Sequence, residues 1–137
     1  MYEEKDYILR LIHEIIRTLA KLLFHKDWDK QVIEVDGEHA QIYRKLCAMI
    51  DDGEINAAEN ILTDYLDTKC QEDFLLALRF YEYLNQKDDD FLAAHGFSRA
   101  EVADGLKYAV DFYGYGSMAE AFLEDLQLDS SDTRIGL

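Results

Sequence analysis

The stretch from Tyr7 to Phe24 carries the strongest hydrophobic pattern in the chain. On an α-helix, where each residue advances by about 100°, its apolar residues cover one continuous half of the cylinder. One neighbouring helix covers less than such a face, so this segment must pack against at least two partners, in the same chain or in another. The residues of the apolar half are Tyr7, Ile8, Leu11, Ile12, Ile15, Ile16, Leu19, Leu22 and Leu23.

The opposite half of the same predicted helix carries Arg10, Arg17 and Lys21, which we call the cationic strip. We expect acidic side chains from the same chain or from a second copy to cover it, at about 0–1 kcal/mol for each surface pair. If the strip instead faces solvent, it is the candidate binding site for an external acidic partner.

The charge of the chain is strongly acidic and unevenly distributed. The 14 basic and 29 acidic residues give a net charge of −15. Residues 1–30 hold six of each kind, so 14 − 6 = 8 basic and 29 − 6 = 23 acidic residues follow them. Such a surface repels nucleic acid and anionic lipid, and it keeps a helical domain soluble.

Caps and glycines, not prolines, divide the rest of the chain, which contains no proline. Residues 25–37 interrupt the helical periodicity and are interpreted as a connection. We predict that the segment from Phe74 to Leu84 is the most buried helix, because it is apolar nearly all round. The further helices are expected at about residues 42–50, 56–66, 98–113 and 117–126, with a short helical turn at 91–95.

The predicted helix ends have specific signals. Gly53, Gly96 and Gly114 each follow an apolar periodic segment, as a left-handed C-terminal cap does, and Phe97 is placed to complete a Schellman ending at Gly96. Capping boxes, in which a side chain at the N-cap and a glutamate three residues later satisfy free N–H groups, are predicted for the pairs Asn56 with Glu59, Ser98 with Glu101, and Ser117 with Glu120.

The pattern as a whole predicts an all-α fold, a compact bundle of about six helices joined by short loops. Residues 1–127 form one helical domain of ordinary size, and residues 128–137 are expected to be a polar, mobile tail. One hairpin has a tetratricopeptide-like spacing, although Leu46 and Lys87 depart from that repeat, so we expect a diverged hairpin instead of a repeat array. The hairpin residues at this spacing are Gly53, Ala58, Leu62 and Leu66.

Motifs that carry chemistry are missing from the sequence. The four histidines are dispersed, and none forms an i, i+4 pair or an HExxH frame, so no metal site is predicted. Asp88–Asp90 lacks the glycine and the glutamate of a calcium loop. Without a phosphate-binding loop or a nucleophile turn, we predict no catalytic residue and no cofactor, and an enzyme is not favoured.

The location of the protein is predicted from its cysteines and its hydropathy. Cys47 and Cys70 lack CxxC spacing and are interpreted as small core residues in a reducing compartment. The first six residues are acidic where a signal peptide would be basic, and charges interrupt the apolar stretch that follows. A cytoplasmic protein is therefore expected.

Two parts of the sequence together resemble a known family. The first part is Asp6-Tyr7-Ile8 with Arg10, Ile12, Ile16-Arg17 and the run from Leu19 to Phe24, and the second is the run from Gly53 to Glu59. They are similar to a small bacterial family of short, acidic, all-helical proteins, mostly from Gram-positive organisms, over residues 1–85. That family has no established activity, so the resemblance implies the fold and a cytoplasmic location but no catalytic residue.

Three kinds of function remain open from the sequence. The leading hypothesis is a non-catalytic protein–protein interaction module, because short-loop helical hairpins and nine tyrosines suit the binding of a peptide or a partner helix. The alternatives are an enzyme or small-ligand protein with a cleft between helices, and peripheral membrane contact through the first helix, which the core's need for its apolar face disfavours. Monomer and homodimer are both possible: Ile16 and Leu23 lie at one margin of the apolar half, and Tyr7 and Leu11 lie at the other.

Overall fold

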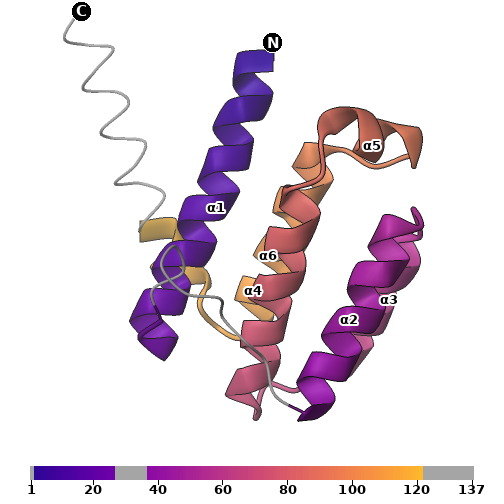
Figure 1. Ribbon diagram of the computed structural model, residues 1–137. Helices are drawn as coiled ribbons and strands as arrows, with labels where there is room; N and C mark the ends of the chain where they lie inside the picture. Colours follow the sequence, from indigo (N-terminus) through magenta and orange to yellow (C-terminus); the bar gives the residue numbers. More distant parts are fainter. Residues whose placement is uncertain (1, 27–36, 122–137) are drawn as a thin grey trace, which may run out of the picture.

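The structure, a computed structural model, describes residues 2–26 and 37–121 of the 137-residue chain. The described parts are helical and contain no strand, which confirms the all-α prediction (Figure 1). A further helical segment occupies residues 116–121, where the described part ends. The preceding helices are α1 (Tyr2–Phe24), α2 (Gly37–Asp51), α3 (Ile55–Tyr65), α4 (Gln71–Asn85), α5 (Asp89–Ala94) and α6 (Arg99–Phe112).

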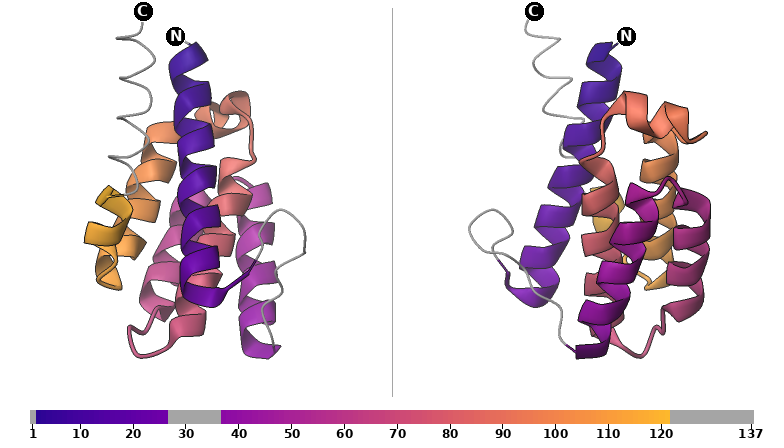
Figure 2. Two further views of the ribbon diagram at one scale, coloured as in Figure 1. Left: turned by 90° about the vertical axis from the view of Figure 1, so that its left-hand side faces the viewer. Right: turned by 45° about the vertical axis from the view of Figure 1, so that its right-hand side comes forward.

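Helix α4 is the centre of the bundle. It packs against α1, α2 and α6, while α3 pairs with α2 as a hairpin (Figures 1 and 2). Eleven of its 15 residues are buried, including Phe74, Leu78 and Leu84. The prediction that this apolar segment is the most buried helix is therefore confirmed, and its cause is visible in the packing: three neighbouring helices leave α4 little free surface.

Helix α1 uses most of its apolar half within the chain. Ile12, Ile16 and Leu19 are buried, and α1 packs against both α4 and α6 as its wide apolar face requires. Ile16 is fully buried in a single chain, whereas Tyr7 is 39% exposed and Leu22 is 55% exposed. The margin that contains Ile16 thus belongs to the intrachain core, and the apolar surface that α1 leaves uncovered lies elsewhere.

The predicted glycine caps are present. Gly96 has a φ of 71°, and the N–H of Phe97 donates to the carbonyl of Leu92 at 2.8 Å, which completes a Schellman ending after α5. Gly53 has a φ of 86° and ends α2 in the same way. The ring of His95 lies against Gly53, so a Cβ at this position would collide with it.

Two predicted N-caps are wrong. Helix α3 begins at Ile55, so Asn56 already lies in its first turn, and Glu59 accepts a hydrogen bond from Tyr81 at 2.7 Å. The helical segment after α6 begins at Gly116, because the carbonyl of Tyr115 accepts the first helical bond, so Ser117 is not its cap. In both cases the chain leaves a glycine turn directly into the next helix, before the expected cap is reached.

The predicted cap at Ser98 is present, because its hydroxyl accepts the N–H of Glu101 at 3.2 Å at the start of α6. A cap that was not predicted begins α5, where Asp88 accepts the N–H of Phe91 at 2.7 Å. The predictions for residues 27–36, for the end of the domain at residue 127 and for the tail at 128–137 lie outside the described residues.

Candidate functional site

The cationic strip lies on the outer side of α1. Arg10 and Lys21 are exposed, and Arg17 forms an ion pair with Glu14 of the same helix at 2.7 Å. Among residues 2–26 and 37–121, no ion pair involves Arg10 or Lys21. Within the described residues, the three strip residues do not surround a common group, and the binding of an acidic partner by the strip stays a prediction.

An apolar hollow opens where α1 meets α6 and the segment 116–121. Its volume is about 170 Å³. Glycine and alanine at the contact positions of 116–121 leave this space, because small side chains cannot fill it. The apolar lining residues are Ile8, Leu11, Ile12 and Ile15 of α1, Ala103, Leu106 and Val110 of α6, and Gly116 and Ala119.

A second hollow continues the first along α1. It has a volume of about 200 Å³ and shares Ile15 and Ala119 with the first hollow. It extends to Leu22 and Met118, which are 55% and 39% exposed. We call the two hollows together the apolar groove. Along α1 the groove runs from Ile8 to Leu22, or about 21 Å at 1.5 Å per residue.

The rim of the apolar groove is mainly acidic. Asp104, Asp111 and Glu120 lie at the rim with a single base, Lys107, which contacts Asp111 at 3.3 Å. Both members of this i, i+4 pair are more than half exposed, so the pair is weak and the rim keeps an excess of two negative charges.

Two aromatic side chains extend the exposed apolar surface beside this rim. Tyr108 and Phe112 of α6 are 51% and 42% exposed, and their rings stack with centroids 6.0 Å apart. They border a shallow hollow that shares Asp104, Lys107 and Asp111 with the rim of the apolar groove. Sequence analysis did not select either residue, because helical spacing alone cannot show which turn of α6 remains uncovered.

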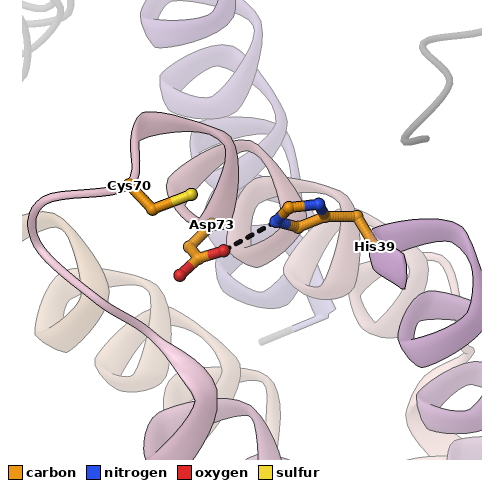
Figure 3. A group of neighbouring side chains, drawn as sticks. All are labelled: His39, Cys70 and Asp73. Carbon is orange, nitrogen blue, oxygen red and sulfur yellow. Dashed lines mark hydrogen bonds and ion pairs between the residues drawn. The ribbon is translucent and has the colours of Figure 1, made fainter. Parts of the chain in front are cut away.

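A cluster of three potential metal ligands lies where α2 and α4 begin. His39 Nε2 and Asp73 Oδ1 are 2.7 Å apart, and one ligand atom from each of His39, Cys70 and Asp73 lies within 4.8 Å of the others. Figure 3 shows the side chains of His39 and Cys70 reaching toward Asp73 from different segments. Within the described part of the chain, these three residues are the group of histidine, cysteine and acidic side chains that lie close enough together to hold one metal ion.

The backbone around the cluster is firmly held. The other carboxylate oxygen of Asp73 accepts the N–H of Asp67 at 3.0 Å. The Tyr113 hydroxyl donates to the carbonyls of Asp67 at 2.8 Å and Cys70 at 3.2 Å. These bonds join the loop between α3 and α4 to the end of α6, so Cys70 and Asp73 have a fixed relative position.

The electrostatics of the cluster do not favour a nucleophilic cysteine. The N–H of Asp73 lowers the pKa of the Cys70 thiol, but desolvation and the Asp73 carboxylate outweigh it, so the pKa is raised above its ordinary value. Asp73 also lies between the thiol and the imidazole, since it holds His39 Nε2 itself. A catalytic cysteine needs a lowered pKa and a base next to the sulfur, and this arrangement provides neither.

A separate polar network joins α4, α5 and α6. The buried guanidinium of Arg99 donates to the carbonyls of Asn85 at 2.6 Å and Lys87 at 2.8 Å, and it pairs with Asp89 at 2.9 Å. Asn85 in turn donates to the carbonyl of Leu9 in α1 at 3.0 Å. The partners are backbone carbonyls, the Asn85 side-chain oxygen and the carboxylate at the start of α5, so Arg99 closes the bundle around α5, and its Nε is buried without a hydrogen-bond partner among the described residues.

One protein family matches most of the chain. A family of unknown function, DUF6483, matches residues 1–114. The chain belongs to this family. Its match includes α1 through α6 and reaches beyond residue 85, where the resemblance of the sequence was placed, whereas the segment 116–121 that closes the apolar groove follows it. No curated protein and no solved structure matches the chain.

Proposed function

We propose that the protein is a non-catalytic interaction module, and that its apolar groove binds an amphipathic helix of a partner protein whose apolar face is flanked by lysine or arginine. The carrying observation is the apolar groove itself, an aliphatic channel between α1 and α6 with an acidic rim, which the described residues leave unfilled. Recognition of an amphipathic helix in a hydrophobic groove is a recurring mode of peptide binding.

The division of the groove into two small hollows favours side chains over a small molecule. Pockets for drug-sized ligands and cofactors enclose about 300–1,000 Å³. The two hollows measure about 170 and 200 Å³ and are arranged end to end. A cavity of about 150 Å³ accommodates a benzene ring, so each hollow fits one or two apolar side chains. A row of anchors spaced along a helix of about four turns matches this shape.

The charges determine which helix fits. The rim has an excess of two negative charges, and the chain has a net charge of −15, so a basic helix is attracted and an acidic one is repelled. The stacked Tyr108 and Phe112 border the same rim and offer further aromatic contact area, to which the Tyr108 hydroxyl adds a polar tip, and interfaces favour both residue types.

The alternatives are less well supported. In the described residues, no helix is both long enough and apolar enough to cross a membrane. Peripheral membrane contact would need the apolar face of α1, but Ile12, Ile16 and Leu19 are already buried in the bundle. An enzyme or small-ligand protein would need a larger cleft with converging polar groups. A cytoplasmic location also remains our proposal, which the free Cys47 and Cys70 support.

Site-specific photo-crosslinking tests the proposal. A photoreactive residue at Leu22 is activated in the native cell, and the crosslinked peptide is sequenced. A basic amphipathic segment of another protein supports the proposal. A crosslink to a second copy, to residues 122–137 of the same chain or to nothing contradicts it. The same photoreactive residue at Ala57, an exposed position on α3, is the control and should not capture the same segment.

A binding measurement gives the second arm. A labelled helical peptide of about 15 residues, with leucines in an i, i+4, i+7, i+11 pattern and flanking lysines, is titrated with the full chain by fluorescence anisotropy. A peptide with the same leucines and flanking glutamates should bind at least about tenfold more weakly. Leu22→Asp with Met118→Asp should weaken binding of the lysine peptide, and Ala57→Asp should not. Equal binding of both peptides would contradict the role of the acidic rim.

A further inference from the structure

We propose that His39, Cys70 and Asp73 form a binding site for a divalent transition-metal ion of the zinc class. One imidazole nitrogen, one thiolate sulfur and one carboxylate oxygen would serve as protein ligands, and a fourth position would be left for water or another group. This proposal does not depend on the apolar groove, because none of the three residues lines it.

The distances are close to those that a tetrahedral ion requires. Zinc binds histidine nitrogen and carboxylate oxygen at about 2.0–2.2 Å and sulfur at about 2.3 Å, so two ligand atoms of one tetrahedron lie about 3.3–3.8 Å apart. The present ligand atoms lie within 4.8 Å of one another, and the His39–Asp73 pair, at 2.7 Å, is closer than a shared ion allows. A shift of about 1 Å in side-chain position is therefore enough, and Cys70 and His39 are both partly exposed, with 16% of the His39 side chain open to solvent.

The chemistry of the donors selects the ion. A mixed nitrogen, sulfur and oxygen set suits zinc and its neighbours in the first transition row, whereas calcium and magnesium prefer oxygen alone. The positive ion would also replace the imidazole as the partner of Asp73, whose side chain is only 7% exposed. A buried carboxylate needs such a partner, and a divalent cation satisfies it together with the thiolate.

The surroundings supply the supporting contacts that metal ligands usually have. The second carboxylate oxygen of Asp73 is fixed by the N–H of Asp67, and Tyr113 holds the carbonyl of Cys70. The ring of His39 packs edge-on against Tyr65, with centroids 5.9 Å apart. Such contacts orient metal ligands, and their loss typically reduces metal affinity by about 10–100-fold.

An alternative interpretation needs no metal. The bond between His39 and Asp73 joins α2 to α4, and Asp73 accepts the N–H of Asp67 in the loop, so the pair has a structural use by itself. That interpretation uses the Cys70 thiol only as a hydrogen-bond partner of the Asp73 carboxylate and not as a metal ligand. The experiment therefore uses the sulfur as its reporter.

Cobalt titration tests the site. The full chain is freed of metal with a chelator, kept reduced without added thiols and titrated with Co²⁺ while the absorption spectrum is recorded. We expect one bound ion per chain, a thiolate-to-cobalt charge-transfer band and the intense visible bands of tetrahedral cobalt, all displaced by Zn²⁺. The chain also contains Cys47, which is free and half-buried, so Cys47→Ser is a matched control that should leave the spectrum unchanged.

The variants separate the proposal from adventitious binding. Cys70→Ser should abolish the charge-transfer band, and His39→Asn should weaken cobalt binding by at least about tenfold, because losing a ligand costs no less than losing one of its supporting contacts. Circular dichroism of each variant shows whether the helices are retained, and Cys70→Ser replaces a half-exposed side chain with one of similar size. A spectrum without the band in the parent protein, or a band that survives Cys70→Ser, would overturn the proposal.

Discussion

Two contact regions of the bundle, which we call seams, are held by different kinds of contact. One lies between α4 and the hairpin of α2 and α3, and the other lies between α1 and α6. On the α2 and α3 side of α4, hydrogen bonds between side chains of different helices cross the seam. Three of them have the same length of 2.7 Å, and they join His39 to Asp73, Tyr83 to Asp51, and Tyr81 to Glu59. Directional bonds of this kind require one spacing and one rotation of the helices.

The seam between α1 and α6 is lined by aliphatic side chains and includes the apolar groove. Dispersion contacts have no preferred direction, and a void at such a seam costs less than an unsatisfied polar group would. The comparison indicates that the α2 side sets the geometry of the fold, while the α1–α6 seam can accept a ligand without breaking a specific bond. Four stability measurements break or sharpen this contrast.

The largest effect is expected at the centre that both seams share. Leu78 of α4 is fully buried, so Leu78→Asp places an uncompensated charge in the core and should lower the free energy of unfolding by about 4 kcal/mol or more. The same change at Leu22, which is 55% exposed at the open seam, should alter it by about 0.5 kcal/mol or less. Chemical denaturation measures both, and a Leu78→Asp melt close to that of the parent would contradict the central position of α4.

The second effect tests how tightly the hydrogen-bonded side is packed. A Cβ on Gly105 of α6 would collide with the Glu59 carboxylate and the Tyr81 ring. Gly105→Ala should therefore destabilise by about 1–3 kcal/mol through overpacking, although alanine is favoured over glycine in a helix by about 1 kcal/mol. Asp104→Ala, at the exposed neighbouring position, is the control and should be nearly neutral. A stabilised Gly105→Ala protein would show that this contact is loose.

The third effect reverses sign between the seams. Ala103 lines the apolar groove, so Ala103→Leu should fill empty space and stabilise the protein by about 0.5–2 kcal/mol, while it blocks binding of the basic peptide. Ala77 in α4 is fully buried where no groove lies, and Ala77→Leu should destabilise by about 1–3 kcal/mol. Thermal or chemical unfolding of the two variants decides the point. If Ala103→Leu is as costly as Ala77→Leu, the α1–α6 seam is as closed as the other.

The sequence predicted local structure well, because local structure depends on neighbouring residues. The helical face of α1, the buried α4 and the cap at Ser98 follow from periodicity and from hydrogen bonds within a few residues. The errors at Asn56 and Ser117 have one cause: a capping side chain is a preference, and a glycine turn that leads straight into the next helix takes precedence over it.

The candidate sites could not be predicted in the same way, because they depend on how the helices pack. Cys70 and Asp73 have an i, i+3 spacing that could have signalled a pair of ligands, but His39 joins them only because α2 lies against α4. The wide apolar half of α1 indicated two or more packing partners. The apolar half of α1 remains open at Leu11 and Leu22 because of the way α6 and the segment 116–121 pack beside it, and this packing cannot be read from periodicity.

The smallest effect is a pH dependence on the hydrogen-bonded side. Desolvation raises the pKa of Glu59, and the bond from Tyr81 offsets this only in part. Because the folded state then binds the proton more tightly than the unfolded state, the contribution of Glu59 to stability is fully present below its unfolded pKa and is lost as the pH rises through its folded pKa.

At neutral pH the half-buried carboxylate is therefore a net cost, and Glu59→Gln, which keeps an acceptor for Tyr81, should be slightly more stable than the parent. In acid this advantage of the Glu59→Gln protein should shrink. The measurement is the difference in unfolding free energy between the two proteins, taken from neutral pH downward. Other carboxyls, such as Asp51, whose pKa is lowered by its bond from Lys87, are present in both proteins and cancel in this difference. Glu54→Gln, at an exposed position, should show no such trend. A Glu59→Gln difference that grows toward acid would mean that the carboxylate stabilises the fold and that its bond from Tyr81 outweighs its burial.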